Sequence, residues 1–346
     1  MSPLTVAIRA NGGEVIGLGH IRRCLTLAEA LARQGATVHF ITNDNQAALD
    51  TVRTIGFDAT PVNLEKDFEQ TRDAVGRLQA NVLVVDSYDI DADYLTRIRD
   101  PRNILVAIDD NADRPLPVDV VINGAAYAPD LSYDALANTV LLLGADYVIL
   151  RKEFASPPVR KIEGPARKVL VTIGGSDPTA LTPRLIDWLL GENTEIQLDV
   201  VVGPFFEVIK PIAEAAAQTP DQVRVHYNPS DMRSLMLEAD LAITGGGQTT
   251  YELAATGTPA LAILTAQNQL QNLQALDRLG TLIFAGSLDD ADLIERLSNG
   301  FATLVNDTER RSRMSRRGRE LVDGQGAERL AQALAEQAAK AASLSS

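Results

Sequence analysis

Cysteine and histidine are rare in this chain of 346 residues, which contains one cysteine and three histidines. The lone cysteine, Cys24, cannot form an internal disulfide, and a metal site built from several cysteines is excluded. The histidines, His20, His39 and His226, lack the paired spacing of common zinc ligands, so we expect no metal site. A single cysteine also fits a reducing compartment.

Long apolar runs and a signal peptide are absent as well. No apolar run reaches the roughly 18 residues that span a membrane. The sequence starts with the strand-like segment Leu4–Ile8 and lacks the basic start, apolar region and cleavage site of a secretory signal. We therefore expect a cytoplasmic protein without a membrane span.

Positive charge is in short supply, because 32 Lys and Arg residues against 46 Asp and Glu residues give a net charge of -14. A field of this sign repels polyanions, so nucleic acid is not expected as a partner. Any phosphate group must then be bound locally, by backbone N–H groups and helix N-termini. The same net charge favours a soluble monomer.

The sequence is long enough for two domains, because one hydrophobic core rarely grows beyond about 300 residues. Hydrophobic residues make up 45% and charged residues 23%, as in ordinary globular proteins. Short β-branched segments alternate with amphipathic helical segments, which is typical of parallel sheets built from βαβ units. The expected strands are 4–8, 37–41, 82–86, 104–108, 118–122 and 140–143 in the first half, and 169–173, 197–202, 223–227, 241–244, 259–264 and 281–284 in the second.

A polar stretch with two adjacent prolines, Pro157 and Pro158, separates the two halves. We predict an N-terminal Rossmann-like domain over residues 1–155, a linker over 156–166, a second Rossmann-like domain over 167–326, and a C-terminal helix and tail over 327–346. The C-terminal helix is expected to cross back to the first domain. Doubly wound sheets bind ligands beyond the carboxyl ends of their strands, so the site is expected in a cleft that both domains face.

The first candidate site is Gly17-Leu18-Gly19-His20, which leads into a helix expected over Gly19–Arg33. Two glycines let the backbone approach a ligand, and the first N–H groups of the helix favour an anion. A complete dinucleotide fingerprint would carry a third glycine where Arg22 stands, so NAD binding is not expected. His20, directly after this turn, is a candidate general base; the alternative is a histidine that only caps the helix.

The second candidate site is Gly245-Gly246-Gly247-Gln248, which follows a predicted strand. A helix is expected to start near Gln248, so the glycines and the helix N-terminus form an anion site suited to a diphosphate. Glu252 lies in the first turns of that helix, where its carboxylate could accept hydrogen bonds from both hydroxyls of a ribose. The alternative role of Glu252 is a favourable interaction with the helix dipole.

Several segments together resemble one family, the UDP-sugar hydrolases of pseudaminic acid (nonulosonic acid) biosynthesis. The matching segments are Gly17–Ala28, Asp86–Tyr88, Asp109–Arg114, Leu143–Phe154, Gly174–Pro178, Thr249–Glu252, Gln267–Gln269 and Asp323–Gly326. That family cleaves UDP-2,4-diacetamido-2,4,6-trideoxy-β-L-altropyranose to the free sugar and UDP. It is similar in fold to GT-B glycosyltransferases such as the lipid II N-acetylglucosaminyltransferase, so the resemblance implies a GT-B fold with two Rossmann-like doubly wound domains.

The resemblance also implies which residues act. His20 matches the proposed general base, and Asn268 matches a second polar residue that orients the sugar or the attacking water. UDP is expected mainly on the C-terminal domain, with the uracil along residues 228–235. The expected sugar-binding residues are Gly17, Gly19, Arg22, Tyr88 and Gln269. The expected nucleotide-binding residues are Gly175, Met232, Gly246, Gly247, Gln248, Thr249 and Glu252.

The implied chemistry is an inverting hydrolysis without a cofactor. A nucleotide diphosphate leaves readily once helix N-termini stabilise its charge, so one base that activates water is sufficient. The alternatives are a GT-B glycosyltransferase that transfers the sugar to an acceptor, a nucleotide-sugar 2-epimerase, and a sensor that binds a nucleotide sugar without chemistry.

Two segments depart from the family pattern. Asn11 stands where the family is expected to carry an aspartate, and Gly12-Gly13-Glu14 replaces a serine-containing run. Gly245–Gln248 likewise replaces a more serine-rich loop. Because the first segment lies beside the expected sugar site, the identity of the sugar depends most on it.

Overall fold

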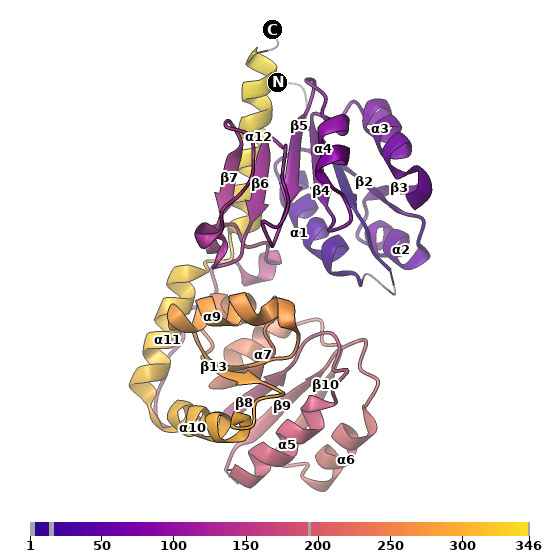
Figure 1. Cartoon of the computed structure of the whole chain (residues 1–346). Helices are drawn as coiled ribbons and strands as arrows, with labels where there is room; N and C mark the ends of the chain where they lie inside the picture. The colour runs from indigo at the N-terminus through magenta and orange to yellow at the C-terminus, as the bar shows by residue number, and fades with distance from the viewer. Residues whose placement is uncertain (1–3, 14–16, 193–194, 345–346) are drawn as a thin grey trace. The chain divides into compact units, whose positions relative to one another are not determined.

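The computed structural model describes residues 4–13, 17–192 and 195–344. The chain forms two compact units, one of Met1–Lys152 with Gln325–Ser346 and one of Glu153–Gly324 (Figure 1). The first unit is therefore built from two separate stretches of the sequence.

The first unit contains a seven-stranded parallel sheet in the order β3-β2-β1-β4-β5-β6-β7. Its strands are β1 (Thr5–Ala10), β2 (Thr37–Asn43), β3 (Asp58–Val62), β4 (Val82–Asp86), β5 (Ile104–Ile108), β6 (Val120–Asn123) and β7 (Val140–Leu143). Its α-helices are α1 (Gly19–Arg33), α2 (Gln46–Thr54), α3 (Asp67–Leu78), α4 (Ala92–Ile98) and α12 (Gly326–Leu344), and its 3₁₀ turns are η1 (Leu64–Lys66), η2 (Ala128–Asp130) and η3 (Ala145–Tyr147), with η4 (Lys152–Phe154) at its boundary. The strand order reverses between β1 and β4, which is where doubly wound sheets bind ligands.

Apolar side chains cover both faces of this sheet, because successive residues of a strand point to opposite sides. In β1, Val6 and Ile8 belong to the core cluster that also contains buried residues of α1 and α12. Ala7 belongs to the opposite cluster, with residues of α3 and α4. The central strands are thus buried on both faces.

Helix α12 completes the core of the first unit. Leu330 and Leu334 are fully buried in the same cluster as the apolar stripe of α1, and the two helices pack against each other. At the surface, Arg33 of α1 donates two hydrogen bonds to the Glu328 carboxylate. Among the described residues, no helix is both long and apolar enough to cross a membrane.

The second unit contains a six-stranded parallel sheet in the order β10-β9-β8-β11-β12-β13. Its strands are β8 (Lys168–Thr172), β9 (Gln197–Val202), β10 (Val223–Tyr227), β11 (Leu241–Thr244), β12 (Ala260–Leu264) and β13 (Leu282–Ser287). Its helices are α5 (Leu181–Glu192), α6 (Lys210–Gln218), α7 (Met232–Glu238), α8 (Thr249–Thr256), α9 (Leu270–Arg278), α10 (Leu293–Asn306) and α11 (Thr308–Leu321), with the 3₁₀ turn η5 (Gln267–Gln269) before α9. This order reverses between β8 and β11, as it does between β1 and β4.

The fold class expected from the sequence is confirmed: each unit is a Rossmann-like doubly wound sheet, and the C-terminal helix packs on the first unit. Six predicted segments, including 82–86 and 241–244, have the same bounds as the observed strands. Strand β3 was missing from the prediction. Its sequence contains Asp58 and Pro61, and such residues are tolerated in β3 because it is an edge strand.

Leu334→Ala tests the contribution of α12 to the first unit. Because Leu334 is fully buried, the truncation should leave a cavity and lower the free energy of unfolding by about 3 kcal/mol in urea denaturation. Lys340→Ala, at an exposed position of the same helix, is the control and should have little effect. Equal losses in the two variants would contradict this role of α12.

Candidate active site

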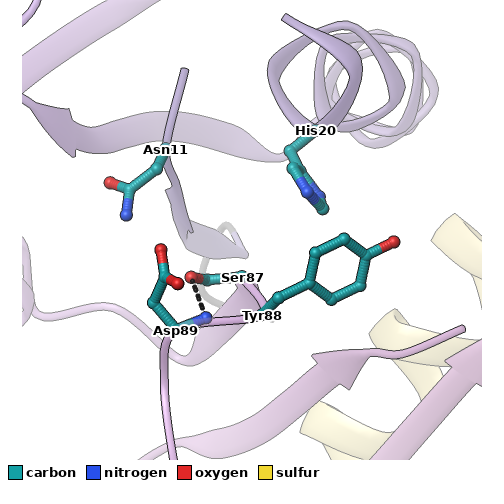
Figure 2. Close-up of a pocket in the computed structure, with 5 residues that line it drawn as sticks. All are labelled: Asn11, His20, Ser87, Tyr88 and Asp89. Carbon is teal, nitrogen blue, oxygen red and sulfur yellow. Dashed lines mark hydrogen bonds between the residues drawn. The ribbon is translucent and has the colours of Figure 1, made fainter. Parts of the chain in front are cut away.

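A cavity of about 210 Å³ opens at the carboxyl edge of the first sheet, where its strand order reverses. Its lining consists of Asn11, which follows β1, His20 at the start of α1, and Ser87, Tyr88 and Asp89, which follow β4. The segments after β1 and β4 are adjacent because these two strands pair, with Ala10 opposite Asp86. In Figure 2, His20 and Tyr88 lie on one side of the cavity, and Asn11 and Asp89 lie on the other.

His20 is oriented by a buried carboxylate. It is the second residue of α1, and its Nδ1 lies 2.6 Å from Oδ1 of Asp86, the last residue of β4. An ionised carboxylate only accepts hydrogen bonds, so this contact places the ring proton on Nδ1 and makes Nε2 the basic nitrogen. The pair has the arrangement of a general base held in one tautomer.

Arg23 neutralises the carboxylate that orients His20. Its Nε and Nη2 each donate to Asp86 at 2.6 Å, and its Nη1 donates to both carboxylate oxygens of Asp110 at 2.9 Å. Burial alone would raise the pKa of Asp86, but the charge of Arg23 and the hydrogen bonds from Arg23 and His20 outweigh it and lower that pKa. Asp86 is therefore ionised at neutral pH.

Tyr88 presents its ring to His20 and keeps its hydroxyl away from the cavity. The two rings meet edge to face, with centroids 4.8 Å apart. The hydroxyl donates to Oδ2 of Asp110 at 2.5 Å, and Figure 2 shows it on the far side of the ring from Asn11 and Asp89. Burial, together with the charge of Asp110, raises the pKa of Tyr88, so its phenol stays protonated.

Asn11 is held by a buried arginine. Arg9 is fully buried and donates to Oδ1 of Asn11 at 2.6 Å, while its other nitrogens pair with the Asp67 carboxylate at 2.6 and 3.0 Å. The charge of Arg9 is thus already balanced by Asp67. A neutral amide at position 11 leaves this network without excess negative charge.

The loop before α1 is closed by its own backbone. Gly13 and Gly17 exchange two hydrogen bonds of 3.0 and 2.8 Å, so the Gly17 N–H is engaged within the loop. Gly17 has φ +79°, and a side chain at Gly17 or Gly19 would meet nothing within 4 Å, so the space beside both residues is open. Arg22 is exposed on α1. Glu14 and Ile16, which belong to the sequence motif, lie outside the described residues.

The glycine loop of the second unit, Gly245–Gln248, is held in place by hydrogen bonds with side chains of η5 and α9. The Gln269 amide oxygen accepts hydrogen bonds from the Gly246 N–H at 3.1 Å and the Thr265 hydroxyl at 3.0 Å. Asn272 donates to the Gly246 carbonyl at 3.0 Å and accepts from the Tyr251 hydroxyl. Gln269, expected to bind the sugar, is therefore part of the support of this loop.

The other residues expected at the nucleotide lie around the same loop. Gly247 faces open space, and Gln248 and Thr249 begin α8, which also carries Glu252. The segments after β8 and β11 are neighbours, because a side chain on Gly245 would come 2.7 Å from the Ile173 carbonyl oxygen, and Gly175 follows in that segment. Met232 is the first residue of α7, and Asn268 is exposed in η5.

The structure thus groups the expected residues by unit. Gly17, Gly19, His20, Arg22 and Tyr88 belong to the first unit, and Gly175, Met232, Gly246, Gly247, Gln248, Thr249, Glu252, Asn268 and Gln269 belong to the second. Sequence reasoning missed the roles of Arg23, Asp86, Asp110 and Asn272. The available signal was a carboxylate at the carboxyl end of each of two buried strands, with Asp86 as the last residue of β4 and Asp109-Asp110 directly after β5.

Comparison with known proteins finds one family model that matches part of this chain. Residues 170–339 match the Glycosyltransferase family 28 C-terminal domain. Among solved structures, MurG of Acinetobacter baumannii superposes with a TM-score of 0.73, covering 96% of this chain and 100% of that one at 17% identity. The chain therefore has a GT-B fold like that of MurG. At this identity the likeness concerns the fold alone.

Three curated relatives are similar over most of this chain. The uncharacterized protein MJ1062 of Methanocaldococcus jannaschii is 26% identical over 279 residues, which are 78% of this chain and 57% of that protein. The spore coat polysaccharide biosynthesis protein SpsG of Bacillus subtilis is 25% identical over 332 residues, 93% of this chain and 95% of SpsG. The Helicobacter pylori protein named pseudaminic acid cytidylyltransferase and UDP-2,4-diacetamido-2,4,6-trideoxy-beta-L-altropyranose hydrolase is 24% identical over 274 residues, 76% of this chain and 45% of that protein. The chain spans about half the length of the first and third.

Asp86→Asn tests the carboxylate that orients His20. The substitution removes one of the two carboxylates that pair with the part-buried Arg23, so we expect the free energy of unfolding at pH 7 to fall by about 3 kcal/mol. Folding lowers the pKa of Asp86, so the ionised Asp86 contributes its full stabilisation of the folded protein above the pKa of an unfolded aspartate, about 3.9. This contribution is lost as the pH falls from there through the pKa of Asp86 in the folded protein. The difference between the two proteins should shrink below about pH 4 in urea denaturation; a constant difference from pH 7 to pH 3 would contradict this assignment.

Gly246→Ala and Gly247→Ala form a matched pair for the glycine loop. A methyl group on Gly246 would lie 2.7 Å from Cβ of Gln269 and 2.8 Å from Cδ1 of Leu273, whereas one on Gly247 would meet nothing within 4 Å. Gly246→Ala should therefore lower the free energy of unfolding of the second unit by about 2 kcal/mol, and Gly247→Ala should leave it nearly unchanged. Thermal or urea denaturation measures both, and similar losses would rule out the close contact of Gly246.

Proposed function

We propose that this protein is a hydrolase of a nucleotide-activated sugar. Its substrate in this proposal is a UDP-linked 2,4-diacetamido-2,4,6-trideoxyhexose or a closely related UDP-amino sugar, and its products are UDP and the free sugar. The observation that carries the proposal is the contact of 2.6 Å between His20 and the buried Asp86 at the wall of an open cavity. The curated name of the Helicobacter pylori relative, which includes such a hydrolase, supports the choice of reaction.

In the proposed reaction His20 acts as the general base. A water oxygen attacks the anomeric carbon of the sugar, the bond from that carbon to the diphosphate oxygen breaks, and UDP leaves with the bonding electrons. Nε2 of His20 takes the proton of the water, and the neighbouring Asp86 carboxylate stabilises the imidazolium that forms. A single displacement of this kind inverts the anomeric configuration.

The second unit would bind the UDP. Its glycine loop lies at the point where the strand order reverses and has the N-terminus of the eight-residue helix α8 behind it. Backbone N–H groups from Gly247 to Thr249 would stabilise the diphosphate both when bound and when leaving, which reduces the need for a general acid. Glu252 would bind the ribose, and Asn268 would orient the sugar or the water.

A glycosyltransferase is the second candidate, and the match to a glycosyltransferase family 28 domain favours it. Both activities use the same nucleotide half and the same base. They differ in the nucleophile, which is water in a hydrolase and an acceptor hydroxyl in a transferase. Release of UDP in the absence of any acceptor therefore separates them.

His20→Ala tests the proposed base. With UDP-linked amino sugars and no acceptor, the wild-type protein should release UDP and free sugar, and His20→Ala should lower kcat by at least about 100-fold with a smaller change in KM. His39→Ala is the control, because His39 is bonded to Thr60 and does not line the cavity. UDP release that requires an added acceptor would favour the transferase, and no release from any UDP-sugar would falsify the hydrolase.

A further inference from the structure

Three carboxylates next to the cavity of the first unit are paired with arginines. Asp86 and Asp110 are both paired with Arg23, at 2.6 and 2.9 Å. Asp67 is paired with Arg9, which also holds the amide of Asn11. These carboxylates are therefore parts of the scaffold and are not available to a ligand.

Asp89 differs from the other carboxylates at this site. It lines the cavity and is exposed. Its backbone N–H donates to the Ser87 hydroxyl at 3.2 Å, but its carboxylate has no hydrogen bond or ion pair with any residue that the structure describes. In Figure 2 this carboxylate is directed toward the amide of Asn11, across the cavity from His20 and Tyr88.

Asn11, Ser87 and Tyr88 do not supply a cation to Asp89. The Asn11 oxygen accepts from Arg9, and the side chain of Asn11 is a neutral amide. The Tyr88 hydroxyl donates to Asp110, and the Ser87 hydroxyl is neutral. The lining therefore carries one carboxylate, that of Asp89, which forms no ion pair with a residue that the structure describes.

We propose that Asp89 selects a sugar that carries a free amino group. This inference rests on the proposed function and narrows the substrate to a UDP-sugar with an ammonium at a ring position where the related diacetamido sugar carries an acetamido group. An ammonium would form a charge-assisted hydrogen bond with Asp89, and a hydroxyl or acetamido N–H would form a weaker, neutral-donor one. A hexuronate would be repelled.

The experiment compares UDP-sugars that differ in a single substituent. UDP-glucosamine is compared with UDP-N-acetylglucosamine and UDP-glucose for position 2, and a UDP-4-amino-4,6-dideoxy sugar is compared with its 4-acetamido form for position 4. We expect the wild-type protein to prefer the amine at one of these positions by about tenfold in kcat/KM for UDP release. Asp89→Asn should lower that preference to about twofold.

Asp73→Asn is the matched control, because it removes the same charge from an exposed position of α3 that does not line the cavity. It should keep the wild-type preference. Dissociation constants of the same UDP-sugars, measured by calorimetry with His20→Ala, give a second readout that does not need turnover. Equal affinity for amine and acetamido sugars, or a preference that survives Asp89→Asn, would overturn the role of Asp89 while leaving the hydrolase intact. If none of the UDP-sugars released UDP, the proposed hydrolase activity would be rejected. The dissociation constants for amine and acetamido sugars would then still test whether Asp89 selects the amine.

Discussion

The guanidinium of Arg23 connects the parts of the first site. It lies between two carboxylates, and each of them fixes one side chain of the cavity: Asp86 orients the imidazole of His20, and Asp110 anchors the hydroxyl of Tyr88. Two buried or half-buried carboxylates in one place would repel each other and would favour protonation without this cation. The positions of His20, the proposed base, and of the Tyr88 ring therefore depend on the same charge.

In the second unit, the side chains that support the glycine loop are neutral. Its glycine loop, the proposed diphosphate site, is held in place by the amides of Gln269 and Asn272. Because these supports are uncharged, they add no negative field next to a bound diphosphate. Charged residues thus support the proposed base, and neutral residues support the proposed diphosphate loop.

The sequence was sufficient for the fold and for the location of the two loops. Periodicity predicted α1 with its observed bounds, and glycines marked both loops, because these signals are local. The partners of the site residues could not be predicted, since Asp86 lies 66 residues from His20 and Asp110 lies 87 residues from Arg23. Such contacts follow from strand order, and an aspartate after a strand has the same sequence signal whether it supports a base or lines a cavity.

The division of the first unit into two stretches has a consequence for biosynthesis. The second unit is continuous in sequence and leaves the ribosome before α12, whereas the core of the first unit lacks Leu330 and Leu334 until α12 has been translated. Until then, the apolar stripe of α1 has no cover from α12. Of the two units, the one whose translation starts earlier is thus the later to reach its final packing, and its incomplete core is open to aggregation and proteolysis in that interval.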